Sequence, residues 1–443
     1  MEPKNRKLIH IYYSALNFRD VMLATEKLSI ATTRHLGQGN AVLGLEFSGR
    51  EDGTGKRICG FASARAMATS ILAEPAHIFD VPDNWTLEEA ATVPVVYATC
   101  YYALIMRAKL QPGESILIHS GTGGIGIAAI TIALSLNCEV FTTVGNDEKK
   151  KYLRRKFPQI KEENIGCSRN VSFEAMIKER TNGKGVDVVL NSLADDKFTA
   201  SIRCLGKSGR FVEIGKYDLA LDREIGLKIF LENISFHAVF LDQLFDSSPK
   251  TAVILSEIMR LIRDGIKSGV VQPLDKTVFG RNSIEEAFRY MSKGIHVGKV
   301  LLKIRDEEQK KRIVPKCLAL SAVPETQFYD TKVYIIVGGL GGFGMEGVNV
   351  QVYTLNAAVK SEAEKLLQMA SSIGPVGGIF NSAVVLKDAF MDCQTAEDYQ
   401  QSMRSQSYSF QEPGRVVEKT MPIHGLLCVL FVHQLWPGQR WSD

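Results

Sequence analysis

The sequence predicts an α/β protein: a doubly wound parallel sheet of the Rossmann type, a partly open, barrel-like β-domain beside it, and an incomplete second Rossmann-type region after both. Three observations predict this fold. Short apolar stretches separated by glycines fill the chain up to about residue 110. From residue 115 onward, strand-like and helix-like segments alternate. Finally, a strand at 332–337 leads into a second glycine-rich turn.

The composition excludes several classes of protein. The 443 residues carry 53 basic and 49 acidic side chains, and a net charge of +4 is too small to predict a nucleic-acid or anionic-membrane surface. Eight cysteines are spread singly, without the cluster that a zinc site requires, so we expect reduced thiols and no metal. Because we find neither a signal peptide nor an apolar run of about 20 residues, we expect a cytoplasmic protein that spans no membrane.

Residues 1–110 are expected to form the N-terminal part of the barrel-like domain. Apolar stretches at 8–13 and 69–72 are typical of strands, and glycines between them break the pattern. Thr86 and Glu89 have the spacing of a capping box, which predicts a helix that carries apolar side chains on one face from Val93 to Leu104.

Residues 111–245 are expected to form the parallel sheet. The alternation predicts strands at 115–119, 139–144, 186–190, 210–214 and 234–241, with helices at 125–136, 148–157 and 195–205. Residues 246–304 lie beyond this repeat, and they are expected to return to the first domain and complete it. Helices are predicted there at 252–266 and 284–291, and a strand at 299–304.

The chain changes character after residue 304. Arg305 to Lys311 is charged and free of apolar residues, which is the composition of a linker, so we predict a linker over 305–330. Residues 331–443 are predicted to hold a cut-down nucleotide-binding region with a strand at 332–337, a helix at 360–370 and a strand at 376–380. Residues 400–443 show no periodicity.

A glycine-rich turn lies between the first strand of the predicted parallel sheet and its helix. It comprises Ser120, Gly121, Thr122, Gly123, Gly124, Ile125 and Gly126. Glycines let the backbone approach a pyrophosphate closely, and the N-terminus of the helix offers free N–H groups. The turn therefore predicts a dinucleotide site; the alternative is a structural turn that binds nothing.

The second strand of the sheet ends without the carboxylate that would hold the ribose 2′-hydroxyl of NAD. It runs into Gly145 and Asn146, and Lys149, Lys150 and Lys151 follow. Clustered ammonium groups suit a 2′-phosphate, so the sequence favours NADPH, with Lys149 as the ligand because it lies closest to the strand. The alternative is that these lysines form a solvated helix face.

Six motifs occur in an order and spacing that resemble a known family. They are Leu16-Asn-Phe-Arg-Asp20, Leu43-Gly-Leu-Glu-Phe-Ser-Gly49, Ala90-Ala-Thr-Val-Pro-Val-Val-Tyr97, Ser120 to Gly126, Leu190-Asn-Ser-Leu193 and Phe211-Val-Glu-Ile-Gly-Lys216. Over about residues 8–304 the chain resembles the enoyl reductase domain of animal-type fatty acid synthase, within the quinone-oxidoreductase-like medium-chain reductase superfamily. The resemblance implies a GroES-like substrate domain. The sequence Gly44-Leu45-Glu46, without the histidine of zinc-dependent relatives, argues against zinc.

The resemblance implies an activity. Enoyl reductases of this kind use NADPH to reduce a trans-2-enoyl thioester, presented on an acyl carrier protein, to the saturated thioester. The resemblance implies Lys216 and Asp242 as acid-relay residues, each following a predicted parallel strand. It also implies cofactor contacts from Asn191, Ser192, Leu193, Gly215, Lys216 and Leu241. The alternative for Lys216 and Asp242 is an ordinary ion pair at the edge of the sheet.

Asn17 is the third candidate catalytic residue. We expect it close to the nicotinamide or the substrate carbonyl, with Asp20 in support; the alternative is an asparagine that only forms a turn. His119 and His237 lie at predicted strand ends. Because no second metal ligand lies at a suitable spacing, we interpret both as packing or hydrogen-bonding residues.

The region after residue 331 resembles the ketoreductase domain that follows the enoyl reductase in fatty acid synthase. Gly338, Gly342 and Gly344 fit its dinucleotide loop, and 376–383 fits its fourth-strand asparagine motif. The helix after the loop and the second strand have no counterpart in the sequence, and no Tyr-x-x-x-Lys pair follows. We therefore predict no ketone reduction.

Two other functions remain compatible with the sequence: a free-standing quinone or enone reductase, and an inactive fragment that acts as a scaffold. The adjoining ketoreductase-like region argues against the first. The chain starts within the early strands of its first domain and ends in sequence unlike the family, which we interpret as a truncated gene product or fragment. The resemblance also suggests a homodimer formed through the nucleotide-binding domain.

Overall fold

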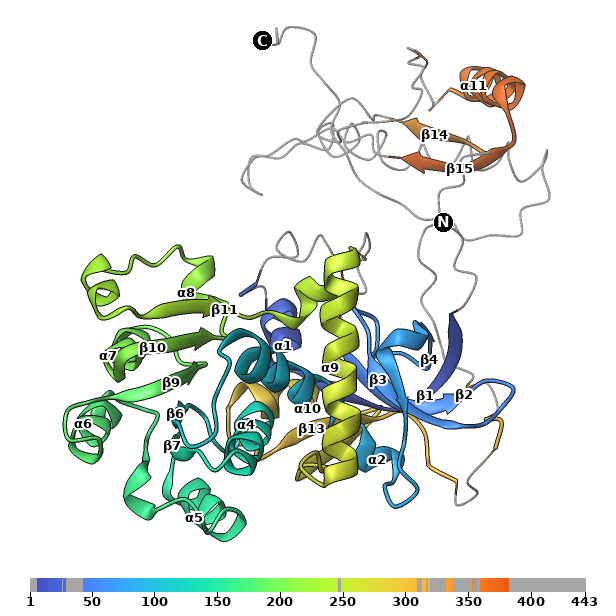
Figure 1. Ribbon diagram of the computed structural model, residues 1–443. Helices are drawn as coiled ribbons and strands as arrows, with labels where there is room; N and C mark the ends of the chain where they lie inside the picture. The colour runs from blue at the N-terminus through green and yellow to red at the C-terminus, as the bar shows by residue number, and fades with distance from the viewer. Residues whose placement is uncertain are drawn as a thin grey trace, which may run out of the picture. The chain divides into compact units, whose positions relative to one another are not determined.

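The computed structural model describes residues 6–25, 27–28, 43–245, 248–308, 313–315, 318, 332–337, 353, 355 and 359–381. They belong to two compact units, Met1–Leu318 and Ala319–Asp443. Within the first unit, the long helix α9 (Pro249–Ser268) runs between a barrel-like sheet and a parallel sheet in the view of Figure 1.

The barrel-like sheet is organised around β1 (Lys7–Leu16). This strand pairs antiparallel with β13 (Lys299–Lys303), β2 (Glu46–Glu51) and β4 (Ser70–Ala73). The order along the sheet is β12-β13-β1-β2-β3-β5, with β3 (Arg57–Phe61), β5 (Ile78–Asp80) and β12 (Lys276–Gly280) as the other members. Strands from both ends of the first unit therefore form one sheet.

The parallel sheet has six strands in the order β8-β7-β6-β9-β10-β11. From β6 the chain moves outward to β8 and then, from β9, in the opposite direction to β11, which is the doubly wound order of dinucleotide-binding folds. The predicted fold class is confirmed. The strands are β6 (Ser115–Ile118), β7 (Glu139–Val144), β8 (Ile165–Cys167), β9 (Val186–Asn191), β10 (Leu205–Glu213) and β11 (Ser235–Ala238), and the helices are α4 (Gly124–Ser135), α5 (Asp147–Lys156), α6 (Ser172–Arg180) and α7 (Asp196–Arg203).

The strand β8 and the helix α6 were not predicted. β8 is only three residues long, which is too short for a periodic signal. In α6 the buried side chains are Phe173 and Ile177, four residues apart in a short segment that also carries four charged residues. A pattern of two apolar positions on one helix face is weak, so the tertiary contacts decide both elements.

The helix predicted after Thr86 is divided. The capping box is present, because the Thr86 side chain accepts a hydrogen bond from the Glu89 N–H, but α2 (Leu87–Ala90) ends after one turn. A second helix, α3 (Pro94–Cys100), begins at its proline and continues into a π-helical segment, Tyr101–Arg107. Proline is favoured at the first position of a helix and disfavoured inside one, which explains the break before Pro94.

Three further helices complete the first unit. Near its end, α10 (Ile284–Ser292) precedes β13, and the helices α1 (Phe18–Ala24) and α8 (Tyr217–Ala220) are short.

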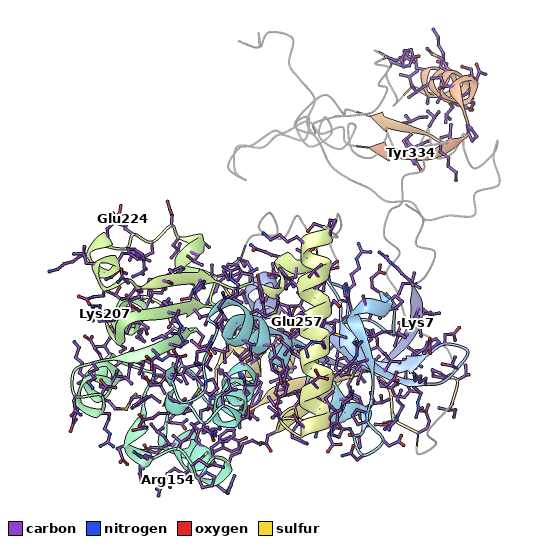
Figure 2. The ribbon with its side chains drawn as sticks, in the orientation of Figure 1. Lys7, Arg154, Lys207, Glu224, Glu257 and Tyr334 are labelled. Carbon is purple, nitrogen blue, oxygen red and sulfur yellow. The ribbon has the colours of Figure 1, made fainter. Side chains whose placement is uncertain are left out.

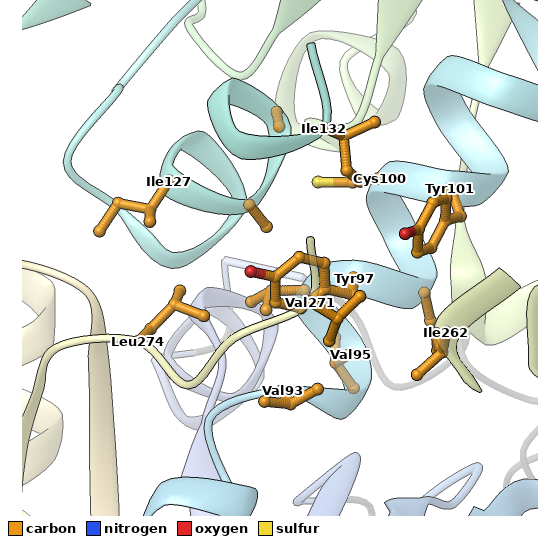
Figure 3. Close-up of a cluster of buried hydrophobic side chains, with 14 of the residues drawn as sticks. Val93, Val95, Tyr97, Cys100, Tyr101, Ile127, Ile132, Ile262, Val271 and Leu274 are labelled. Atoms are coloured by element: carbon orange, nitrogen blue, oxygen red, sulfur yellow. The ribbon is translucent and has the colours of Figure 1, made fainter. Parts of the chain in front are cut away.

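The largest apolar cluster surrounds α3. Figure 3 shows Val95, Tyr97 and Cys100 of this helix together with Ile127 of α4 and Ile262 of α9, all buried. Burying a large apolar side chain contributes roughly 1.5–3 kcal/mol, so this cluster holds helices of both halves together. Within the described residues, the run Leu87–Arg107 is long and apolar enough to cross a membrane, but 83% of its apolar window is buried in the molecule.

Charges of both signs cover the outside of the first unit. Arg154, Lys207 and Glu224 are exposed on the parallel-sheet half, and Figure 2 shows them at its margin. Some exposed charges are paired, such as Arg260 with Glu257 on α9 at 2.7 Å. Because exposed pairs contribute only about 0–1 kcal/mol, the fold depends mainly on the buried clusters.

The start of the predicted linker packs on the barrel-like sheet instead of leaving it. Glu308 accepts hydrogen bonds from Tyr12 Oη at 2.8 and 2.7 Å, and Arg50 Nε lies 3.3 Å from its carboxylate. Glu307 accepts a hydrogen bond from the Leu87 N–H, at the start of α2, at 2.9 Å. Two of the charges that suggested a linker, those of Glu307 and Glu308, are therefore held by partners more than 200 positions away in sequence, which composition alone does not reveal.

The second unit contains two parallel strands, β14 (Val333–Val337) and β15 (Val376–Asn381), and the helix α11 (Lys360–Ile373). Leu367 and Ala370 of the helix are buried in a cluster with Ile335. These elements match the strands and the helix predicted there. The predicted glycine turn at 338–344, the end of the predicted asparagine motif and residues 400–443 lie outside the described residues.

Candidate functional site

The glycine-rich turn passes directly from β6 into α4. Ser120 adopts a φ of 54°, in the left-handed region. A Cβ on Gly126 would lie 2.4 Å from the Ser120 carbonyl oxygen, and one on Gly121 would lie 2.2 Å from Thr142 Oγ1. Only glycine fits at these two positions, so the backbone is as tight as a pyrophosphate site requires. The turn and the N-terminus of α4 at Gly124 therefore fit the pyrophosphate of a dinucleotide.

A loop from the barrel-like half closes on this turn. The Gly298 N–H donates to the Thr122 carbonyl at 2.8 Å, and Gly298 forms a parallel bridge with Gly123. The stem of Lys299 lies against Gly124, because a Cβ there would be 2.9 Å from Lys299 Cδ. The two halves of the first unit thus meet at the predicted cofactor site.

Two basic side chains lie near the end of β7, Lys149 from α5 and Arg169 from the segment after β8, and the sequence predicted only the first. Lys149 is partly buried, and its Nζ donates to the Gly294 carbonyl at 2.7 Å. Burial, and then the charge of Arg169, lower the pKa of Lys149. Arg169 Nε would lie 3.1 Å from a Cβ on Gly145. Among the described residues neither cation is in an ion pair, so both remain available to an anion at the end of β7.

Asn191 and Glu213 connect the ends of β9 and β10. Asn191 Nδ2 donates to Glu213 Oε2 at 2.5 Å and to the Leu193 carbonyl at 2.8 Å. The Gly215 N–H donates to Glu213 Oε1 at 2.5 Å. Burial raises the pKa of Glu213 to about 8, so the carboxyl is mostly protonated at neutral pH. This buried pair fixes the backbone of two segments that the sequence predicts as cofactor contacts.

The other predicted cofactor residues of this edge, Ser192, Leu193 and Leu241, differ in their surroundings. Ser192 Oγ lies 3.3 Å from Ser120 Oγ, which brings the turn after β9 to the glycine-rich turn. Leu193 is partly buried against the apolar cluster under β9 and β10. Leu241 is buried at the start of a short 3-10 turn, Leu241–Phe245, and packs in the main core.

Lys216 and Asp242 form a close ion pair. Lys216 Nζ lies 2.5 Å from Asp242 Oδ2 and 5.0 Å from the centre of the Phe240 ring. Asp242 is only 3% exposed. Arg19, on α1, adds a second cation, with its Nε 3.5 Å from the same oxygen. The arrangement holds an ammonium group at a fixed place beyond β10, where it can donate a proton.

Asn17 lies in a second buried network. Its Nδ2 donates to Glu46 Oε1 at 3.1 Å, and its Oδ1 accepts from Lys299 Nζ at 3.0 Å. Lys299 Nζ also lies 2.5 Å from Glu46 Oε1, and the Val95 N–H donates to Glu46 Oε2 at 2.8 Å. Glu46 is 0% and Lys299 4% exposed. Both polar atoms of the Asn17 side chain are therefore bound within the protein, and within the described residues no hydrogen bond or ion pair joins this network directly to Lys216.

Asp20 supports the start of α1. Its carboxylate accepts hydrogen bonds from the Asn17 N–H at 2.9 Å and the Gly44 N–H at 3.0 Å. Burial raises the pKa of Asp20, and these hydrogen bonds oppose the rise. Because Asp20 and Asn17 together form a capping box, the helix that carries Arg19 starts at a fixed position.

Five residues of the site were not predicted as functional: Arg19, Glu46, Arg169, Glu213 and Lys299. A charged residue inside an apolar strand segment was a usable signal for Glu46 and Glu213, since such a residue must be paired or protonated when buried. Arg169 and Lys299 carried no comparable signal, because their contacts are with residues distant in sequence.

His119 has a packing and hydrogen-bonding role, and His237 lies on β11. His119 Nδ1 lies 3.0 Å from Thr143 Oγ1 and its Nε2 lies 2.8 Å from Ser201 Oγ; burial lowers its pKa to about 3. Burial also lowers the pKa of His237. Across the part of the chain that the structure describes, no group of three or more His, Cys, Asp or Glu residues could hold a metal ion.

Comparison with known sequences identifies two regions. A family model described as zinc-binding dehydrogenase matches residues 164–302, and a model described as KR domain matches residues 345–411. The highly reducing polyketide synthase frbB of Dothideomycetidae sp. (strain 11243) is 32% identical over 445 residues, which cover 89% of this chain and 17% of that protein. The lovastatin diketide synthase lovF of Aspergillus terreus (strain NIH 2624 / FGSC A1156) is 32% identical over 430 residues, which cover 88% and 17%. The chain thus spans about 17% of the length of these relatives.

Comparison with solved structures finds enoyl reductases. The CurK enoyl reductase is 30% identical with a TM-score of 0.60, and the match covers 68% of this chain and 91% of that chain. The JamJ enoyl reductase (apo form) is 29% identical with a TM-score of 0.60, and the match covers 67% and 90%. The sequence suggested a relative of fatty acid synthase, whereas the multidomain relatives found are polyketide synthases.

Proposed function

The chain belongs to the enoyl reductase family, and from that membership we propose that it reduces trans-2-enoyl thioesters to saturated acyl thioesters with NADPH. The observation that carries the proposal is the Lys216–Asp242 ion pair. Lys216 follows β10, and the glycine-rich turn follows β6 of the same sheet. Since the carboxyl ends of parallel strands share one edge, a proton donor and a dinucleotide site belong to the same region.

The reaction requires a hydride at the β-carbon and a proton at the α-carbon. NADPH, when bound, supplies the hydride. The electron pair of the C=C bond then moves toward the thioester carbonyl, whose oxygen gains negative charge, and the positive charge of Lys216 stabilises it. We assign the proton to the Lys216 ammonium: one of its N–H bonds breaks as the α-C–H bond forms, and water restores the proton. Asp242 orients the ammonium.

The basic residues at the end of β7 support NADPH over NADH. Lys149 and Arg169 would hold the 2′-phosphate, and the tight backbone of 120–126 would hold the pyrophosphate. Asn17 remains a candidate in this proposal. Because its carboxamide is bound to Glu46 and Lys299, we propose that it orients the nicotinamide region and exchanges no proton.

Turnover by the full chain tests the proposal. NADPH consumption is measured with a crotonyl thioester and with a quinone, beside a fluorescence titration of NADPH. We expect consumption with the thioester. Consumption with the quinone alone would identify a free-standing quinone reductase, and a chain that neither binds nor consumes NADPH would fit a scaffold.

The double variant Lys216→Ala with Asp242→Ala tests the assigned donor. We expect the rate with the thioester to fall by about 10²-fold or more, which is typical for loss of a general acid. Lys207→Ala changes an exposed lysine on β10 and serves as the control. A double variant that keeps nearly the wild-type rate would remove Lys216 from the mechanism.

The substrate is proposed to arrive on an acyl carrier protein, as the relation to multidomain synthases suggests.

We also propose a homodimer. β11 ends the parallel sheet, and just before it Leu227 and Leu231 are 78% and 79% exposed. A second copy could extend the sheet and cover these leucines. Light scattering should give a dimer mass that falls in the Leu227→Glu, Leu231→Glu variant; a monomeric wild type would contradict the proposal.

We further propose that residues 331–443 reduce no ketone, although a KR domain model matches within them. The support is the sequence, in which no Tyr-x-x-x-Lys pair occurs after residue 331. NADPH consumption by the full chain with a 3-ketoacyl thioester would contradict this proposal.

A further inference from the structure

Three charged side chains from separate parts of the fold meet at one carboxylate oxygen. Lys216 Nζ and Arg19 Nε lie 2.5 and 3.5 Å from Asp242 Oδ2. Lys216 follows β10, Asp242 lies in the 3-10 turn after β11, and Arg19 belongs to α1 beside the barrel-like sheet. Arg19 is therefore a link between the barrel-like half and the assigned proton donor.

The position of Asp242 depends on its side-chain contacts. It lies in a 3-10 turn of five residues, Leu241–Phe245, whose backbone hydrogen bonds are weaker than those of an α-helix. The carboxylate is 3% exposed, so water gives it little solvation. Arg19, with its Nε 3.5 Å from the carboxylate oxygen, adds an electrostatic attraction to the Lys216 ion pair.

Arg19 is itself held in place. Its side chain is 9% exposed, and its Nη1 lies 3.9 Å from Asp20 Oδ1. Asp20 is fixed by the backbone N–H groups of Asn17 and Gly44. The guanidinium group thus approaches Asp242 from a helix start that is anchored to the barrel-like half.

We propose that Arg19 is a positioning residue for the proton transfer: it holds Asp242, and through Asp242 it holds the Lys216 ammonium where the substrate's α-carbon is protonated. The catalytic part of this inference rests on the proposed function. Arg19 itself donates no proton to substrate. Without it, Asp242 keeps one partner, the donor ammonium gains freedom, and protonation slows more than hydride transfer.

Unfolding experiments test the bridge independently of activity. The full chain is compared with Arg19→Gln, Asp242→Asn and the double variant. We expect the two substitutions to be coupled. The sum of the melting-temperature losses of the two single variants should exceed the loss of the double variant by about 3 °C or more. Additive losses would overturn the proposal, whether or not the protein reduces an enoyl thioester.

Isotope effects test the catalytic part. With a crotonyl thioester, Arg19→Gln should lower kcat about tenfold or more and change KM little. Its solvent deuterium isotope effect on kcat should rise and the effect of deuterated NADPH should fall, because protonation becomes slower than hydride transfer. A loss of general packing would reduce both steps and leave this balance unchanged.

Two further variants complete the experiment. Arg19→Lys keeps the charge and should recover part of kcat, and it replaces Arg19→Gln if the latter does not fold. Arg260→Gln alters an exposed arginine of α9 and should match the wild type. Isotope effects equal to those of the wild type would overturn the proposal when they are measured in Arg19→Gln or, if that variant does not fold, in an Arg19→Lys variant whose kcat is lowered. A wild type that consumes no NADPH would reject the proposed function, while the unfolding cycle would still decide the bridge.

Discussion

Lys149 and Lys151 lie on the same helix but differ in their surroundings. Lys149 is partly buried and reaches the Gly294 carbonyl, whereas Lys151 is exposed. Of the two, only Lys149 lies with Arg169 near the end of β7. Lys149 is therefore the lysine of the basic run that we propose as a phosphate ligand.

Lys149→Gln should weaken NADPH binding selectively. A charged hydrogen bond to phosphate contributes about 1.5–3 kcal/mol, so the NADPH dissociation constant should rise about tenfold or more, while that of NADH changes little. Fluorescence titration with both cofactors measures this, and Lys151→Gln is the matched control. An equal loss for NADPH and NADH would argue against a 2′-phosphate contact.

Glu213 should make the stability of the first unit depend on pH. Its pKa is raised from 4.5 to about 8 by burial. Between these values the unfolded chain releases the proton and the folded chain keeps it, so wild-type stability should fall as pH rises through this window and level off above it. Below the unfolded-state pKa, where both states are protonated, the stability no longer depends on pH through Glu213.

The comparison with Glu213→Gln isolates this contribution. The amide cannot ionise and loses one hydrogen bond at every pH, so the variant starts with a constant deficit. Its stability relative to the wild type should improve by about 4 kcal/mol between pH 5 and pH 8.5. Urea unfolding at both pH values measures the difference, and a difference that does not change with pH would show that Glu213 ionises normally.

At the scale of the element, the entry into α4 depends on Gly126. A Cβ there would lie 2.4 Å from the Ser120 carbonyl oxygen and 2.7 Å from Gly121 Cα. The turn cannot accept a methyl group without moving the N–H groups that we propose bind the pyrophosphate. The helix and the binding site are therefore constrained by the same backbone contact.

Gly126→Ala should consequently lower both the melting temperature and the affinity for NADPH, the latter by about tenfold or more, because N–H groups displaced from the pyrophosphate lose charge-assisted hydrogen bonds. Differential scanning fluorimetry with and without NADPH measures both. Gly226→Ala is the control, since a Cβ at Gly226 meets nothing within 4 Å. Wild-type affinity in Gly126→Ala would show that the turn adapts freely.

At the scale of the whole molecule, the Glu46–Lys299 pair joins two strands of the barrel-like sheet, and the Lys299 side chain extends this contact to the glycine-rich turn of the parallel-sheet half. Glu46 lies on β2 and Lys299 on β13, and the stem of Lys299 touches the glycine-rich turn at Gly124. Charges buried this completely are tolerated because each neutralises the other and Asn17 and the Val95 N–H satisfy the remaining atoms.

Lys299→Met should destabilise the first unit by about 3–5 kcal/mol, because it leaves a buried carboxylate without its partner. The double variant Lys299→Met, Glu46→Gln should recover part of this loss. Lys303→Met, on the same strand but in an exposed pair with Asp306, should cost less than about 1 kcal/mol. Chemical denaturation measures all three, and a Lys299→Met variant as stable as Lys303→Met would contradict the role of the pair.

The sequence by itself determined the parallel sheet and the glycine-rich turn. Both depend on local features: β-branched strands of regular spacing, and glycines between a strand and a helix. The capping box at Thr86 and the basic run at Lys149 were predicted for the same reason, because each depends on residues that are close in the sequence. The strand β8 and the break before α3 were not predicted, because three residues or one proline change the hydrophobic pattern too little.

Only the tertiary structure decided how charges are paired. Arg19 with Asp242, Asn17 with Lys299 and Tyr12 with Glu308 join residues more than 200 positions apart. A sequence shows that a residue is charged, but burial sets the cost of that charge, and the fold selects the partner that offsets it. For the same reason the residues at 305–308, linker-like in composition, are in fact a bound part of the barrel-like half.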